Sequence, residues 1–186
     1  MKKIIVQVVV VMTLILAGCS KTKDMEIVYK ELSQEESQLL TLTGNNIMRY
    51  NIKNLPNDKD YELKLVYEVY ENKEKVKDET IMAMAYEASD EKLQDLDLWI
   101  NIQEGKIRCL KGGAYAYYDV EENIENLSRE YFSKSSTFDL GDEVYLFRGV
   151  GGKNGMKISE LGVVSDKDSL LEGTSNVFIK LVCEEK

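Results

Sequence analysis

The stretch YELKLVYEVYE, residues 61–71, carries the clearest structural signal in this chain of 186 residues. Apolar or aromatic side chains occupy every second position: Tyr61, Leu63, Leu65, Tyr67 and Val69. The alternate positions include Glu62, Lys64, Glu68 and Tyr70. Alternation with a period of two, sustained over this length, is typical of a β-strand with one face in a core and the other toward solvent. The segment therefore predicts a long, half-buried strand.

The same alternation recurs on both sides of this stretch. In residues 96–103, Leu98, Ile100 and Ile102 share one face and Trp99 lies on the other. Near the C-terminus, one face carries Val177, Ile179, Leu181 and Cys183. Further strands are predicted over 38–43, 46–53, 76–87, 106–110, 114–120 and 142–148. Glycine-bearing turns at 44–45, 104–105 and 111–113 predict hairpins and a meander.

One segment breaks this rhythm. Ile124, Leu127 and Tyr131 have helical spacing, which predicts a short helix over 121–132. Regular strands with a single short helix predict an all-β fold, an antiparallel β-sandwich. The sequence does not distinguish an immunoglobulin-like arrangement from a jelly-roll-like one.

The N-terminus has a different character. Lys2 and Lys3 precede an apolar run from Ile4 to Leu16, and the run ends in Leu16-Ala17-Gly18-Cys19. A positive start, a short apolar middle and a small-residue cleavage site are the three parts of a secretory signal. With the cysteine directly after the small pair, the segment resembles the signal peptide and lipobox of bacterial lipoproteins. The resemblance implies cleavage between Gly18 and Cys19 and a diacylglycerol on the Cys19 thiol.

An uncleaved membrane helix is the alternative for this segment. The run from Ile4 to Leu16 is thirteen residues long, and a helix needs about 20 apolar residues to span a bilayer. Length therefore favours a signal peptide. The predicted organisation is a signal peptide over 1–18, a lipidated tether over 19–36 and a β-sandwich domain over 37–186. The lipid would hold the domain at the outward-facing side of the cell membrane. Two acyl chains on one residue bind a bilayer firmly, whereas a single chain binds only marginally.

Composition restricts the function. The chain has no histidine, 33 acidic and 24 basic residues, and a formal net charge of −9. The missing histidine removes the commonest general base and metal ligand near neutral pH, which argues against an enzyme. The acidic balance argues against a nucleic-acid partner, because phosphate binding needs clustered cations. The sequence predicts neither a cofactor nor a metal site.

Two cysteines remain beyond the lipobox. Cys109 and Cys183 both occupy positions predicted to face the core. Outside the cytoplasm such a pair can form a disulfide, and the alternative is two free buried thiols that pack as small hydrophobic groups.

Three aromatic residues are the best candidates for ligand binding. Alternation places Tyr115 and Tyr117 on one face of their strand, and Trp99 points outward from a strand nearby. Exposed aromatic rings on a flat sheet can stack on sugars or anchor a partner protein, although tyrosine is also simply a good strand residue. The sequence thus predicts a non-catalytic binding module for an envelope glycan or protein. The alternatives are a histidine-free glycan hydrolase that uses two carboxylates, and a structural component of an envelope complex.

Overall fold

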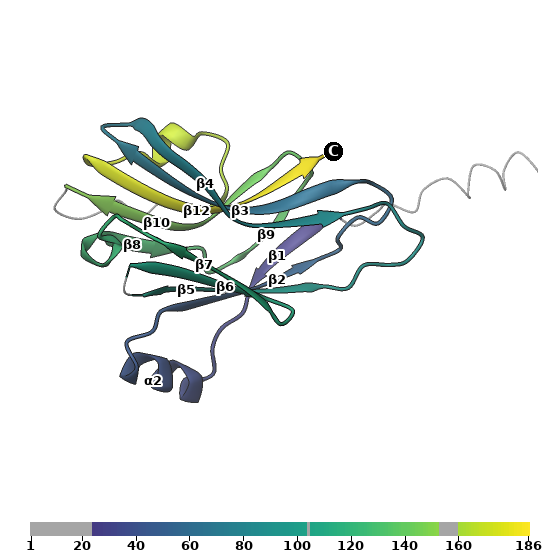
Figure 1. Ribbon diagram of the computed structural model, residues 1–186, viewed down its shortest axis with the longest axis horizontal. Helices are drawn as coiled ribbons and strands as arrows, with labels where there is room; N and C mark the ends of the chain where they lie inside the picture. Colours follow the sequence, from purple (N-terminus) through teal and green to yellow (C-terminus); the bar gives the residue numbers. More distant parts are fainter. Residues whose placement is uncertain (1–23, 104, 153–159) are drawn as a thin grey trace, which may run out of the picture.

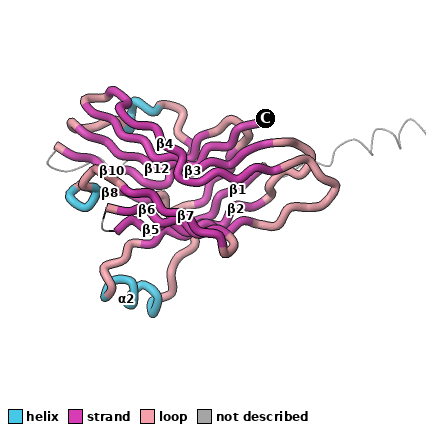
Figure 2. The backbone as a smooth tube through the Cα atoms, in the orientation of Figure 1, coloured by secondary structure: helices cyan, strands magenta, loops and turns pink. Residues whose placement is uncertain are grey.

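A computed structural model describes residues 24–103, 105–152 and 160–186 (Figure 1). Within these ranges the strands form two six-stranded antiparallel sheets, which face each other across a common core (Figure 2). The predicted all-β sandwich is confirmed. Over the described residues, the helices are too short or too polar to cross a bilayer.

Sheet A is the lower layer in Figure 1. Its strand order is β7 (Ala114–Asp119), β6 (Lys106–Lys111), β5 (Leu96–Gln103), β2 (Ile47–Lys53), β1 (Met25–Tyr29) and β9 (Ser135–Phe138). Strands β5, β6 and β7 form the predicted meander, because their turns include Gly105, Gly112 and Gly113, all of which have positive φ.

Sheet B is the upper layer. Its strand order is β11 (Gly162–Val163), β10 (Glu143–Gly151), β12 (Ser175–Glu185), β3 (Tyr61–Glu71) and β4 (Glu74–Tyr86). The sixth strand, β8 (Ser128–Tyr131), pairs with β10 over Phe147–Val150, further along the strand than β11. The long β3–β12 pair forms the middle of the layer, with eleven residues of each strand in register.

The alternation found in the sequence defines the inner faces of both sheets. The five predicted inward side chains of β3 are at most 2% exposed: Tyr61, Leu63, Leu65, Tyr67 and Val69. Leu98 and Ile100 on β5 and the four predicted core residues of β12 are fully buried. Burial of this much apolar surface is the main favourable contribution to folding.

The outward side of β3 differs from the prediction. Glu68 and Tyr70 were expected to face solvent, yet they are 0% and 6% exposed. Residues 161–172, here called the covering segment, lie over this side of sheet B. The segment contains β11 and the 3₁₀ helix η2 (Lys167–Leu170), and its Leu161, Leu170 and Leu171 are buried.

The predicted strand over 38–43 is wrong, because this region belongs to helix α2 (Gln34–Leu42). The Ser33 side chain accepts a hydrogen bond from the Glu36 N–H, and the Glu36 carboxylate accepts one from the Ser33 N–H, which forms a capping box. Gly44, with φ +69°, ends the helix instead of forming a hairpin turn. Its N–H donates to the Thr41 carbonyl, and the Asn45 N–H donates to the Leu40 carbonyl, as in a Schellman motif.

The helix predicted over 121–132 is also wrong. Only Ile124–Asn126 forms a short 3₁₀ turn, η1, and Ser128–Tyr131 forms β8. Ile124 is 3% exposed and enters the core from this turn. The unpaired edge of β10 offers hydrogen-bond partners to β8, and this non-local pairing outweighs the weak local helical pattern.

The β domain begins earlier than residue 37. Strand β1, which lies in the range assigned to the tether, pairs with β2 on one side and β9 on the other. Met25 and Ile27 are 4% and 0% exposed. The described part of the predicted tether is therefore partly built into sheet A.

Both cysteines of the described chain are free and buried. Cys109 lies on β6 in sheet A and Cys183 on β12 in sheet B, so the disulfide considered from the sequence is not formed. Burial raises the pKa of each thiol to about 12, which keeps both protonated at neutral pH.

Candidate functional site

The face of sheet A that points away from sheet B brings the three predicted binding aromatics together. Strand register places side chains of β2, β5, β6 and β7 in cross-strand rows on this face. The first row consists of Arg49, Trp99, Leu110 and Tyr115. The second row, two residues further along each strand, consists of Ile47, Asn101, Arg108 and Tyr117. We call this surface the aromatic face.

A shallow groove of about 510 Å³ follows the two rows. Its lining includes Trp99, Tyr115 and Tyr117 from the sequence prediction, together with Leu110 and Arg108. The tyrosine side chains are unusually open, since Tyr115 is 75% and Tyr117 64% exposed. Rings this exposed contribute little to the core, so they are available to a ligand.

Alternation along β7 sorts its three tyrosines as the sequence predicted. Tyr118 points to the opposite side, where its ring lies 5.5 Å from that of Tyr67. Tyr115 and Tyr117 remain together on the aromatic face. The strand therefore divides its aromatic residues between core and groove.

Trp99 is held in place by a cation. The Arg49 guanidinium carbon lies 4.4 Å from the centroid of the Trp99 ring, which is a cation–π contact. The two residues are direct cross-strand neighbours on β2 and β5. This stacking fixes the orientation of the indole and leaves one positive group in the first row.

The groove is basic although the chain is acidic. Lys106 and Arg108 are part of its lining, and no aspartate or glutamate of the described chain is. Lys106 forms an ion pair of 2.9 Å with Asp119 and lies 5.9 Å from the Tyr117 ring centroid. Arg49 and Arg108 form no ion pair within 4.0 Å among the described residues, although Arg49 lies near enough to Glu36 to contribute to the lowered pKa of that carboxyl.

These basic residues were not recognised from the sequence. The signal was present in residues 106–110, where Lys106, Arg108 and Leu110 alternate with the buried Ile107 and Cys109. What the sequence did not give is the register that puts Arg108 between Asn101 and Tyr117. Without that register, the two arginines and the three aromatics cannot be assigned to one surface.

Helix α2 stands off sheet A on the side of the aromatic face (Figures 1 and 2). The Asn101 amide nitrogen, in the second row, donates to the Asn45 side chain at 3.2 Å and to the Asn46 carbonyl at 3.3 Å. The helix itself has no buried residue, and its Leu39 and Leu42 are 63% and 84% exposed. The α2 excursion therefore flanks the groove at its Asn101 end.

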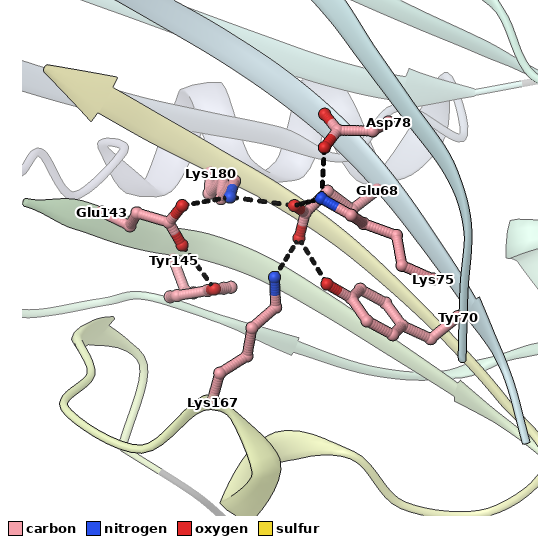
Figure 3. A network of polar contacts seen from close by, with 8 residues as sticks. All are labelled: Glu68, Tyr70, Lys75, Asp78, Glu143, Tyr145, Lys167 and Lys180. Carbon is pink, nitrogen blue, oxygen red and sulfur yellow. Dashed lines mark hydrogen bonds and ion pairs between the residues drawn. The ribbon is translucent and has the colours of Figure 1, made fainter. Parts of the chain in front are cut away.

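The outer side of sheet B carries a different cluster, centred on the buried carboxylate of Glu68 (Figure 3). Lys167 lies 2.8 Å and Lys180 2.9 Å from its oxygens, and Lys75 lies 3.4 Å away. Lys180 also contacts Glu143 at 2.5 Å, and Glu143 accepts a hydrogen bond from the Tyr145 hydroxyl. Glu68 and Glu143 are thus two carboxylates joined through one lysine.

The charges of this cluster compensate one another. Burial by itself would raise the pKa of Glu68, but the hydrogen bonds from Lys167 and Lys180 outweigh it and lower the pKa. The pKa of Glu143 is lowered in the same way, with Lys180 and Tyr145 opposing the effect of burial. Both groups are therefore ionised at neutral pH, and neither has the raised pKa of a general acid.

A second hollow, of about 630 Å³, lies where β1 begins and β2 and β12 end. Its described lining is formed by turn residues of both charges, including Asp24, Asn54, Lys59 and Glu185, and contains no aromatic ring. It is larger than the groove, but it has no stacking surface, and its charged lining is mainly acidic. The aromatic face is therefore the better candidate site.

The other predicted site residues, Gly18 and Cys19, lie outside the described residues, as does the whole predicted signal peptide. Among the described residues, no group of cysteine, aspartate and glutamate side chains is arranged to hold a metal ion. Comparison with protein families, with curated proteins and with solved structures found no match for the chain.

Proposed function

We propose that this protein is a lipid-anchored, outward-facing binding module that takes up a cell-envelope glycan on the aromatic face of sheet A. The observation that carries the proposal is the groove lined by Trp99, Tyr115 and Tyr117 on an uncovered sheet. The exposed rings of Tyr115 and Tyr117, with the partly buried ring of Trp99 beside them, offer a stacking surface for the apolar faces of sugar rings at low cost in side-chain entropy.

The shape of the site supports binding rather than catalysis. The groove is shallow, and its described lining has no carboxylate that could act as a general acid or nucleophile. Glu68 and Glu143, a pair of acids that the structure brings near each other on the opposite sheet, are both committed to Lys180. A glycosidase needs one carboxylic acid with a raised pKa, and the ion pairs of this cluster act in the other direction.

The location in the cell rests on the sequence at Leu16-Ala17-Gly18-Cys19. Replacement of the lipidated residue, Cys19→Ala, should leave the chain uncleaved at Gly18 and free of acyl chains. Mass spectrometry of the membrane-extracted protein measures both effects. A wild-type N-terminus without an acyl adduct would contradict the anchor and leave the binding proposal to stand without it.

Glycan binding is tested by calorimetry on the full-length protein in detergent, with a panel of soluble neutral and acidic oligosaccharides. We expect binding that weakens at least tenfold, or about 1.4 kcal/mol, in the Trp99→Ala and Tyr117→Ala variants, because aromatic anchors dominate most binding surfaces. Val76→Ala, which truncates an exposed side chain on β4 of the other sheet, is the matched control. Absence of binding to every oligosaccharide, or equal binding by the aromatic variants, would refute the proposal.

A further inference from the structure

The charged residues around the groove indicate the chemical class of its ligand more closely than the aromatic rings do. The chain has 33 acidic and 24 basic residues, so a random surface patch would carry more carboxylates than cations. The described lining of the groove has Lys106 and Arg108 and no carboxylate, and Arg49 adds a third cation beside Trp99. Lys106 is paired with Asp119 and Arg49 interacts with Glu36, so the net positive charge of the aromatic face comes mainly from Arg108.

The two arginines of this region differ from most cations elsewhere in the molecule. Strand lysines such as Lys53, Lys64 and Lys180 each have a carboxylate within 3.2 Å. Arg49 and Arg108 have no such partner among the described residues. A guanidinium offers several N–H donors in one plane, which suits the paired oxygens of a carboxylate or phosphate.

From these observations, and resting on the proposed function, we infer that the glycan bound by the aromatic face is anionic. Its rings stack on Trp99 and Tyr117, and its carboxylate or phosphate groups pair with Arg108 and Arg49. Register supports this arrangement, because Arg108 lies directly between Asn101 and Tyr117 in the second row, and Arg49 adjoins Trp99 in the first. A neutral glycan would use the rings and leave the Arg108 guanidinium without an anionic partner.

Single-stranded nucleic acid also combines rings with anionic groups, and aromatic residues with arginines bind it in other proteins. The net charge of −9 opposes a long polyanion with a charge on every unit. A glycan with spaced acidic groups meets the local cations without the same long-range repulsion, since the interaction is screened beyond about 10 Å at moderate salt. An oligonucleotide is therefore included in the test as a competitor.

The experiment compares matched probes on the full-length protein in detergent by calorimetry. Hexagalacturonate and its methyl ester differ in the carboxylate charge, which esterification replaces by a methyl group, and maltohexaose and phosphorylated maltohexaose differ in the phosphate. We expect the charged member of at least one pair to bind about tenfold more tightly than its neutral partner. The pair that shows the larger ratio identifies the acidic group. Raising the salt concentration should reduce the ratio.

Two variants separate the inference from the proposed function. Arg108→Gln should weaken the charged probe several-fold more than the neutral probe and so reduce the preference, whereas Tyr117→Ala should weaken both probes by a similar factor. Lys53→Gln is the control, because Lys53 is a cation on the outer side of β2 that is already paired with Glu26.

Each outcome decides one question. Equal affinity for the charged and neutral probes, or a preference of the same size in Arg108→Gln as in the wild type, overturns the inference and keeps glycan binding. Tighter binding of hexadeoxythymidine than of either charged glycan overturns it in favour of nucleic acid. Failure of every glycan to bind overturns the inference and the proposed function together.

Discussion

The outward sides of the two sheets are built from the same kind of alternating strand, yet one is largely buried and the other is largely exposed. On sheet B, Glu68, Arg148, Phe178 and Lys180 are at most 4% exposed. On sheet A, Tyr115 and Tyr117 are more than half exposed. The difference is that the covering segment lies over sheet B, whereas the end of the aromatic face that carries Tyr115 and Tyr117 is left open. An outward-facing side chain of a strand is therefore exposed to solvent only where no later segment of the chain packs over that side of the sheet.

The covered side has to satisfy every charge that it buries, because an unpaired buried charge is very costly. The covering segment supplies Lys167 to Glu68 at 2.8 Å and Glu172 to Arg148 at 3.5 Å. The open side has no such requirement, since water can solvate Arg108. We take the complete pairing on sheet B as structural and the incomplete pairing on sheet A as the mark of the binding side.

The largest expected effect comes from breaking the buried pairing. Glu68→Gln keeps the shape of the side chain but leaves Lys167 and Lys180 near a neutral group, so we expect the free energy of unfolding to fall by about 3 kcal/mol. Glu62→Gln is the matched control, because Glu62 points to the same side of β3 and pairs with Lys64 near the surface. Its loss should cost about 0.5 kcal/mol or less. Urea unfolding followed by circular dichroism measures both, and equal values would contradict the structural role of Glu68.

The connection between the covering segment and β12 is the next feature to test. Gly173 has φ +63°, and a Cβ added there would lie 2.3 Å from the Gly151 carbonyl oxygen. Gly173→Ala should therefore lower the free energy of unfolding by about 2 kcal/mol or more, from backbone strain and this contact together. Gly112→Ala is the control, because Gly112 also has a positive φ, +51°, but has open space around it. It should cost only about 1 kcal/mol. A smaller loss for Gly173→Ala than for Gly112→Ala would show that the close contact with Gly151 is not limiting.

These two experiments concern contacts that the sequence did not predict, and the reason is their distance along the chain. Lys167 and Glu68 are 99 residues apart in the sequence, and no local sequence pattern around Glu68 predicts that they form an ion pair. By contrast, the inner face of β3 was predicted residue by residue, because the alternation of apolar and polar residues within a strand indicates which of its sides is buried. The aromatic residues of the groove were predicted on the same basis.

Helix α2 is a different kind of miss. Its capping box is local, and Ser33 followed by Glu36 three positions later is a known start signal for a helix. The sequence pattern was interpreted as a strand over 38–43 instead, next to the turn residues 44–45. Helix α2 buries none of its residues, so no amphipathic pattern was there to correct that interpretation.

A third prediction concerns the loss of folding stability at low pH. The pKa of Glu68 is lower in the folded protein than in the unfolded chain, where a glutamate titrates near about 4.3. Between these two pKa values the unfolded state binds more protons, so the stabilising effect is complete at neutral pH and is lost as the pH falls through the folded value. Wild-type protein should lose stability as the pH falls below about 5, and Glu68→Gln should lose less over the same range. Urea midpoints at several pH values test this, and parallel pH profiles for the two proteins would contradict it.

The smallest expected effect on stability is that of a substitution on the aromatic face of sheet A. Comparison with a substitution on the covered side of sheet B tests the difference between the two sides most directly. Tyr117→Ala removes a ring that is 64% exposed, so the free energy of unfolding should change by no more than about 0.5 kcal/mol. Tyr70→Ala provides the contrast on sheet B, because Tyr70 is 6% exposed and its ring packs 5.7 Å from that of Phe178. It should destabilise the protein strongly, as truncation of a buried aromatic does. Thermal unfolding of both variants measures the difference. If Tyr117→Ala were as destabilising as Tyr70→Ala, the aromatic face would be part of the folded core rather than a surface kept for a ligand.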